Sequence, residues 1–301
     1  MAHGRAGRTL FSTRLISPIA RRACAPFLSH AWRRVRMRLR ASLALALLAP
    51  ALWAAEARAE GPRPGPAYQL KLELDLPIIL IGGGMASGFA FMSEAPGVHC
   101  APSCDKSTVF KLDRFAAGWY DPDWAKVGDI ATASTLAAPL IVVALDEGLA
   151  HGLNDDLVIA ESALITSALQ ILTSYAVARP RPRVYGDEAS LESRSDANAA
   201  RSFFSGHVAN TVATSVATLR TFQRLGKPGL GYAMLGVGLA GSALVGVSRV
   251  AAGSHFPSDV VIGAMVGTGV GLALPAMHDS PVRLVPVASS EYAGLLVRGA
   301  L

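Results

Sequence analysis

The stretch SRVAAGSHFPSD, residues 248–259, concentrates polar chemistry between two long apolar segments. Arg249 is a fixed cation with a planar fork of donors, and His255 can act as a nucleophile or a proton carrier. Pro257 suits the first turn of a helix, which places His255 just before a helix and Asp259 in its opening turn. The carboxylate of Asp259 is therefore expected within reach of the His255 ring. Taken alone, the stretch fits equally well a loop whose charges face water.

A second polar junction, SYAVARPRP at residues 174–182, ends an apolar run with arginines held between prolines. Proline disfavours helical backbone in the residue before it, so the chain that carries Arg179 and Arg181 is extended and directs both side chains. Guanidinium groups placed in this way suit a phosphate. For this segment alone, an arginine-rich loop at a membrane edge is the alternative.

A third junction, RSFFSGH at residues 201–207, opens the next apolar run. Ser205 and Gly206 are expected at a helix N-terminus, where free backbone amides and the helix dipole favour an anion. His207 would face the same anion and could protonate a departing oxygen.

Apolar runs near the length that crosses a bilayer follow one another along the chain. They cover residues 76–92, 128–146, 158–178, 203–221, 229–251 and 259–277. Many are rich in Gly, Ala, Ser and Thr, which lets helices approach closely. The pattern predicts an all-α bundle of about six helices embedded in a membrane, with the buried helices of a soluble domain as the alternative. Up-and-down counting puts the three polar junctions at helix ends on one side.

The N-terminal segment has the features of a signal peptide. Residues 1–40 carry ten arginines and no acid, so the net charge of +6 arises there and the remainder is slightly acidic. A nucleic-acid surface is therefore not implied. An apolar run over residues 41–53 and the pattern Ala57-Arg-Ala59 follow, which predicts cleavage after Ala59, with an uncleaved anchor helix as the alternative. Met37 is a second candidate start.

Cys100 and Cys104 lie in the polar loop HCAPSC, residues 99–104. An oxidising compartment would let them form a disulfide, and too few ligands lie nearby for a metal site. We therefore expect a disulfide loop and no metal.

These features divide the chain into four parts. Residues 1–59 form the leader, and residues 60–127 form an N-terminal periplasmic segment with an apolar helix and the Cys100–Cys104 loop. Residues 128–278 form the catalytic helical domain, and residues 279–301 form a tail that could be two short strands. Residues 68–76 alternate apolar and polar side chains as a short strand does.

Together the three junctions resemble the signature of the type 2 phosphatidate phosphatase superfamily, which includes bacterial class A acid phosphatases and vanadium-dependent haloperoxidases. That signature is Lys, six residues, Arg-Pro; then Pro-Ser-Gly-His; then Ser-Arg, five residues, His, three residues, Asp. Nine of its eleven fixed positions match, namely Arg181, Pro182, Ser205, Gly206, His207, Ser248, Arg249, His255 and Asp259. Ser174 stands where the family has Lys, and Phe204 stands where it has Pro.

The resemblance implies a metal-independent phosphatase that needs no cofactor and works through a phosphohistidine. His255 attacks phosphorus, while Asp259 holds its other ring nitrogen and raises its basicity. His207 protonates the leaving oxygen and then activates water.

The same resemblance implies which residues hold the phosphate oxygens. Phosphate-binding roles fall to Arg181, Arg249, Ser205 and Gly206. The absent Lys at Ser174 removes a phosphate-contacting cation, for which Arg179 or Arg183 could compensate.

The expected substrate is a phosphorylated or pyrophosphorylated lipid, and the expected setting is the bacterial inner membrane with the site facing the periplasm. This orientation follows when the leader, cleaved or not, delivers residue 60 to the outside, residues 76–92 do not cross, and run 128–146 goes inward. Three alternatives remain open: a soluble periplasmic nonspecific acid phosphatase, a vanadium-dependent haloperoxidase, and a non-catalytic member weakened by Ser174.

Overall fold

The computed structural model describes residues 65–88, 98–279, 283–288 and 293–298. The signal peptide, the cleavage after Ala59 and the start at Met37 lie outside these residues, and they remain predictions.

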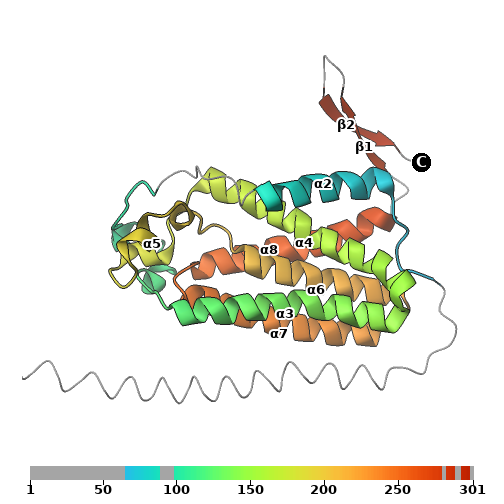
Figure 1. Cartoon of the computed structure of the whole chain (residues 1–301), viewed down its shortest axis with the longest axis horizontal. Coiled ribbons are helices and arrows are strands. Elements are labelled where there is room, and N and C mark those ends of the chain that lie inside the picture. The colour runs from blue at the N-terminus through green and yellow to red at the C-terminus, as the bar shows by residue number, and fades with distance from the viewer. Residues whose placement is uncertain (1–64, 89–97, 280–282, 289–292, 299–301) are drawn as a thin grey trace, which may run out of the picture. The chain divides into compact units, whose positions relative to one another are not determined.

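Long helices form a bundle in the described part of the chain (Figure 1). They are α2 (Leu72–Gly88), α3 (Pro122–Glu147), α4 (Leu149–Val177), α6 (Gly206–Arg224), α7 (Pro228–Ala251) and α8 (Pro257–Asp279). A short helix, α5 (Leu191–Ser195), lies in the segment between α4 and α6. Each long helix coincides with one of the apolar runs, so the prediction of an all-α bundle of about six helices is confirmed.

Proline sets the start of two helices that flank the site. Pro228 begins α7 and Pro257 begins α8, and a missing N–H costs no hydrogen bond at a first helical position. His255 therefore lies just before α8 and Asp259 lies in its first turn, as the sequence predicts.

Helix α6 is enclosed by α3, α4, α7 and α8, against which it packs. It is buried along most of its length although it is rich in Ser and Thr. The hydroxyls of Thr214, Ser215 and Thr218 donate to carbonyls one turn earlier in the same helix, at 2.9, 2.6 and 2.7 Å. Because these bonds satisfy the three hydroxyls within α6, these side chains need no polar partner on the neighbouring helices.

Three glycines of α8 let that helix approach α6 closely. Gly263, Gly267 and Gly271 recur one turn apart along α8, and each faces a backbone carbonyl. A Cβ at any of the three positions would collide with that carbonyl oxygen, so only glycine permits this spacing. The carbonyls belong to Ser205, Ala209 and Ala213.

Four helices in the described ranges, α3, α4, α7 and α8, are long and apolar enough to cross a membrane. Large apolar side chains face outward from them. Examples are Leu145 on α3, Leu172 on α4, Val247 on α7 and Val261 on α8, all of them more than half exposed. An outer surface of this kind is typical of helices that face lipid.

The loop that contains the two cysteines packs on the end of the bundle where α4 and α7 end. Cys100 and Cys104 form a disulfide, with Cα atoms 5.0 Å apart. The Cys104 amide donates to the Val184 carbonyl at 3.2 Å, and Cys104 shares an apolar cluster with Val184 and Phe256. The disulfide therefore lies at the same end of the bundle as the polar junctions.

The two ends of the described chain differ in how well they were predicted. The tail forms one of its two expected structures, an antiparallel hairpin of β1 (Arg283–Ala288) and β2 (Ala293–Arg298). The prediction of a short strand over residues 68–76 is wrong, because the helix α2 begins at Leu72. The Asp75 carboxylate accepts a hydrogen bond from the Lys71 amide at 2.6 Å, which satisfies a free N–H at the helix start.

Candidate active site

A polar cavity of about 400 Å³ lies where α4 and α7 end and α6 and α8 begin. It draws on all three polar junctions, and its lining consists of Gln170, Arg181, Arg183, Asp196, Asn198, Arg201, Gly206, His207 and His255. The three polar junctions therefore meet at helix ends on one side of the bundle, as the helix count predicts.

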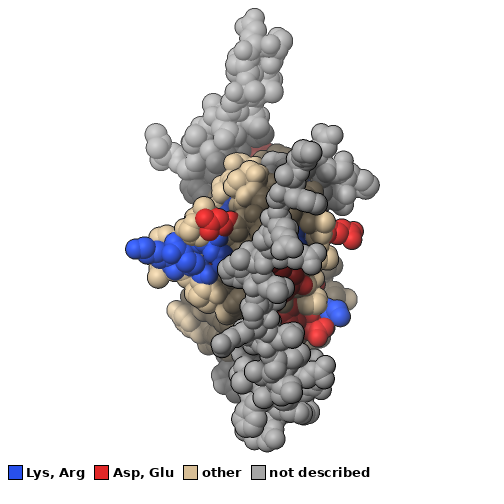
Figure 2. Space-filling model, turned by 90° about the vertical axis from the view of Figure 1, so that its left-hand side faces the viewer, with Lys and Arg blue, Asp and Glu red and all other residues tan. Residues whose placement is uncertain are grey.

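The arginines near the cavity are mostly buried. Arg183, Arg201 and Arg249 are all buried. Figure 2, which faces the left-hand side of Figure 1, shows most of the visible Lys and Arg side chains at one edge of the described surface and Asp and Glu at separate places. The arginines near the cavity are thus shielded from water, which strengthens their attraction for an anion.

His255 is buried in the short connection between α7 and α8. Its Nδ1 lies 2.6 Å from the backbone carbonyl oxygen of Ser202. Because a carbonyl only accepts hydrogen bonds, Nδ1 carries the proton and Nε2 keeps its lone pair. A neutral imidazole with this tautomer is competent as a nucleophile.

The surroundings of His255 also keep its ring neutral. Burial lowers the pKa of His255 well below its usual value, and the charge of Arg181 lowers this pKa further. Both effects disfavour the imidazolium form. His255 therefore keeps its lone pair at pH values where an exposed histidine is partly protonated.

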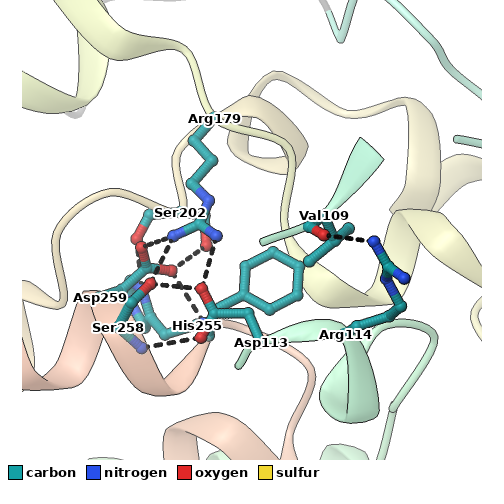
Figure 3. A network of polar contacts seen from close by, with 9 residues as sticks. Val109, Asp113, Arg114, Arg179, Ser202, His255, Ser258 and Asp259 are labelled. Carbon is teal, nitrogen blue, oxygen red and sulfur yellow. Dashed lines mark hydrogen bonds and ion pairs between the residues drawn. The ribbon is translucent and has the colours of Figure 1, made fainter. Parts of the chain in front are cut away.

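Asp259 reaches His255 through Ser202 rather than directly, which differs from the expectation that it holds the ring (Figure 3). Its Oδ2 accepts from the Ser202 hydroxyl at 2.5 Å and from the Phe256 amide at 2.8 Å. Asp259 is the third residue of α8, and acids at this position commonly reach back to the amide that precedes the helix. Ser202 then presents its carbonyl to the ring.

Arg179 neutralises Asp259 and joins it to Asp113, as Figure 3 shows. One guanidinium nitrogen lies 2.5 Å from Asp259 Oδ1, and the other lies 2.8 Å from Asp113 Oδ2. The guanidinium also stacks on the Phe256 ring, 4.4 Å from its centroid. Asp113 in turn accepts from the Ser258 amide at 3.0 Å. These contacts commit Arg179 to the start of α8, so it does not replace the missing Lys at the cavity.

His207 is the second residue of α6 and faces Asp129 of α3. Its Nε2 lies 3.5 Å from Asp129 Oδ1, and the same oxygen pairs with Arg249. Asp129 thus connects the expected proton carrier with an expected phosphate ligand. Arg249 lies outside the lining of the cavity, and its buried Nε has no hydrogen-bond partner.

Ser205 and Gly206 lie at the N-terminus of α6, where the sequence places them. The Ser205 amide donates to the Asp259 carbonyl at 3.0 Å, and the buried Ser205 Oγ has no hydrogen-bond partner. Gly206 lines the cavity beside Gln170, and a Cβ on Gly206 would lie 2.9 Å from Gln170 Cγ. The start of α6 therefore contributes backbone and dipole to the cavity, which suits an anion.

Three arginines line the cavity, and each is held differently. Arg181 has a buried Nε without a hydrogen-bond partner. Arg183 pairs with Asp196 at 3.3 Å. Arg201 stacks on the Tyr175 ring at 4.5 Å and donates to its hydroxyl at 2.7 Å. Guanidinium groups that share one cavity suit the oxygens of a phosphate or diphosphate.

Ser174, at the position of the family Lys, is fully buried and does not line the cavity. Its hydroxyl donates to the Ile171 carbonyl at 2.8 Å, within α4. Its neighbour in sequence, Tyr175, supports Arg201, which brings a cation to the cavity from a different segment.

Sequence reasoning missed three residues that the structure places at the site: Arg201, Ser202 and Asp129. Arg201 and Ser202 open the RSFFSGH junction, and that position was the available signal for them. Asp129 lies in an apolar run far from the motifs, where no sequence signal marked it.

Helix ends that bring two histidines and three arginines into one cavity suit a phosphoryl-transfer enzyme. A family model described as the PAP2 superfamily matches residues 157–282, a segment that contains the three junctions and every residue that lines the cavity. This match supports membership of the PAP2 superfamily for the matched segment, as the resemblance predicted. A comparison with curated proteins and with solved structures found no match. Membership supports a phosphatase-type function in general.

Proposed function

We propose that the chain hydrolyses phosphomonoester or diphosphate groups of membrane lipids through a phosphohistidine intermediate. The observation that carries this proposal is that His255 and His207 line one cavity with Arg181, while Nδ1 of His255 is held by the Ser202 carbonyl. That bond leaves Nε2 as the nucleophilic atom.

The reaction divides into two displacements at phosphorus. In the first, Nε2 of His255 bonds to phosphorus, the bond to the leaving oxygen breaks, and the His207 imidazolium gives its proton to that oxygen. Burial and the charge of Arg249 lower the pKa of His207 to about 4, so the imidazolium has to form when the negatively charged phosphate binds beside it. In the second, His207 takes a proton from water as the water oxygen attacks phosphorus, and the P–N bond breaks to release phosphate. Arg181 and the start of α6 stabilise the charge that spreads over the equatorial oxygens.

Arg201 supplies the positive charge that Ser174 does not. It lines the cavity with Arg181 and Arg183, and its guanidinium is oriented by Tyr175. A planar guanidinium binds two oxygens at once, whereas an ammonium acts as a point charge. A diphosphate or a polar phosphoester headgroup would use the extra donors.

The lipid substrate and the inner-membrane location rest on the outer surface of the helices. Four helices carry apolar exteriors, and the cavity lies at their ends, where a lipid headgroup would arrive. A periplasmic orientation is supported by the Cys100–Cys104 disulfide at the same end, because disulfides persist in oxidising compartments.

The test is phosphate release from purified full-length protein in detergent. Phosphatidate, a polyprenyl diphosphate and p-nitrophenyl phosphate are compared in wild type, His255→Ala and His151→Ala. His151 is an exposed histidine near the start of α4 and serves as the control. We expect lipid substrates to be preferred, His255→Ala to lose activity, and His151→Ala to keep it. Full activity of His255→Ala, or no release from any substrate, would remove the proposal.

A further inference from the structure

A second buried polar cluster lies away from the cavity and joins three helices. It consists of Asp75 on α2, Glu161 on α4 and His278 on α8, all of them buried. One potential ligand atom from each lies within 4.8 Å of the others. His278 is 19 residues beyond Asp259 on α8, which separates the two Cα atoms by about 29 Å at 1.5 Å per residue.

The tautomer of His278 directs a lone pair at two carboxylates. Its Nδ1 lies 3.1 Å from the Leu274 carbonyl oxygen, which only accepts, so Nδ1 carries a proton. Its Nε2 lies 2.9 Å from Asp75 Oδ1 and 3.7 Å from Glu161 Oε2. A neutral ring with this tautomer would point the Nε2 lone pair at two carboxylate oxygens, so either a proton or a metal ion must lie between them.

Glu161 strengthens that requirement. It is fully buried, and neither of its carboxylate oxygens has a hydrogen-bond partner among the residues that the structure describes. With a proton on Nε2 and both carboxylates ionised, the three side chains would still carry one net negative charge among them. A divalent cation with a neutral imidazole makes the charge of these three groups balance, which lowers the cost of burying them.

Other charged groups nearby have different partners. Asp155, also on α4, accepts from the Ala67 and Tyr68 amides at 3.0 Å each. Lys71 donates to the Met277 carbonyl at 3.3 Å and adds positive charge beside the cluster. Neither contact supplies a hydrogen bond to Glu161.

We propose that Asp75, Glu161 and His278 bind a divalent metal ion, with Zn²⁺ as the best match. Imidazole together with carboxylates suits zinc, whereas oxygen-only sets suit magnesium and calcium. Ligand atoms about 2.0 Å from a tetrahedral ion lie about 3.3 Å apart, between the 2.9 and 3.7 Å distances at His278 Nε2. The hydrogen bond from Nδ1 to a carbonyl is the outer-shell contact that commonly orients such a ligand.

The ion would fasten α2 to α4 and α8. It would take no part in the chemistry of the cavity, so the proposal does not depend on the proposed function. The His255→Ala protein should therefore bind the ion as wild type does.

The test measures Zn²⁺ binding to full-length protein in detergent after removal of bound metal with a chelator. Isothermal titration and elemental analysis give the affinity and stoichiometry, and thermal unfolding gives the stabilisation. Glu161→Gln keeps the size of the side chain but removes its charge. Asp156→Asn makes the same change of charge on the same helix and is the matched control.

Wild type and Asp156→Asn should bind one Zn²⁺ per chain and unfold at a higher temperature with it. Glu161→Gln should bind more than about 10-fold more weakly, since loss of even an outer-shell partner costs that much. Asp75→Asn serves as the second variant if Glu161→Gln does not fold. Wild type that binds no Zn²⁺, as expected for a protonated cluster, or equal affinity in Glu161→Gln and Asp156→Asn, would overturn the proposal.

Discussion

Replacing Asp259 with Asn should destabilise the protein strongly while slowing the reaction only moderately. The carboxylate accepts hydrogen bonds from Ser202, Phe256 and Arg179 in a buried environment. Asn retains one acceptor oxygen and turns an NH₂ group toward the donors, so Arg179 loses one of its two buried counter-charges, Asp259, and keeps Asp113. Breaking a buried ion pair in this way costs about 3–5 kcal/mol. At about 2–4 °C per kcal/mol for a chain of this size, Tm should fall by about 6–20 °C.

The rate should respond less, because the carbonyl of Ser202 and not the carboxylate holds the His255 ring. A carboxylate in direct contact with a catalytic histidine contributes about 10⁴-fold to kcat. Misplacing the Ser202 carbonyl should weaken one hydrogen bond, which corresponds to about 10-fold and at most 100-fold. Tm is read from tryptophan fluorescence, and kcat from phosphate release below the lower Tm.

The control for this prediction is Asp123→Asn, which alters an exposed carboxylate in the first turn of α3. It should leave both Tm and kcat nearly unchanged. A loss of about 10⁴-fold in kcat for Asp259→Asn, with Tm within 2 °C of wild type, would refute a role through Ser202.

Three further outcomes are expected. Ser174→Lys should leave inhibition by inorganic phosphate nearly unchanged, as Thr173→Lys on the same helix should, because Ser174 does not line the cavity and Arg201 already brings a cation to it. A tightening of about 10-fold, the effect of one added charge-assisted hydrogen bond, would speak against compensation by Arg201. The lowered pKa of His255 keeps the ring neutral as pH falls, so the midpoint of the acid limb in a plot of kcat/KM against pH should lie below pH 6.5. A midpoint above pH 6.5 would contradict the lowered pKa. Gly253→Ala should lower Tm by more than Gly148→Ala. Both glycines have positive φ, but only a Cβ at Gly253 would collide with a neighbour, the Trp119 carbonyl. Equal Tm values for the two variants would disprove this.

Local rules explain why the ends of the helices could be predicted from the sequence. Pro257 permits only a helix start, so the placement of His255 before α8 required no tertiary information. The extended chain at Arg181 likewise follows from the prolines around it. In both cases the decisive residues are neighbours in sequence.

The partners of the charged groups could not be predicted, because they come from distant segments. Ser202 lies 57 residues from Asp259, and Asp129 lies 120 residues from Arg249. Which acceptor takes the proton of His255 depends on how the segment between α4 and α6 packs on α8. The same packing places Arg201 at the cavity. The family signature contains no residue at this position, so it could not predict this arginine.

The glycine contacts between α8 and α6 have a consequence for how substrate range can change. The start of α6 is hydrogen-bonded to the start of α8 through Ser205 and Asp259, and the glycine spacing fixes the height of one helix against the other. A slip of one turn would move Asp259 by about 5.4 Å and separate it from Ser202. The glycine contacts thus fix the starts of α6 and α8 against each other, while Arg181, Arg183 and Arg201 lie in the segment between these helices and α4. New substrates should therefore arise through changes around these three arginines, whereas a larger side chain at Gly263, Gly267 or Gly271 should abolish every activity alike.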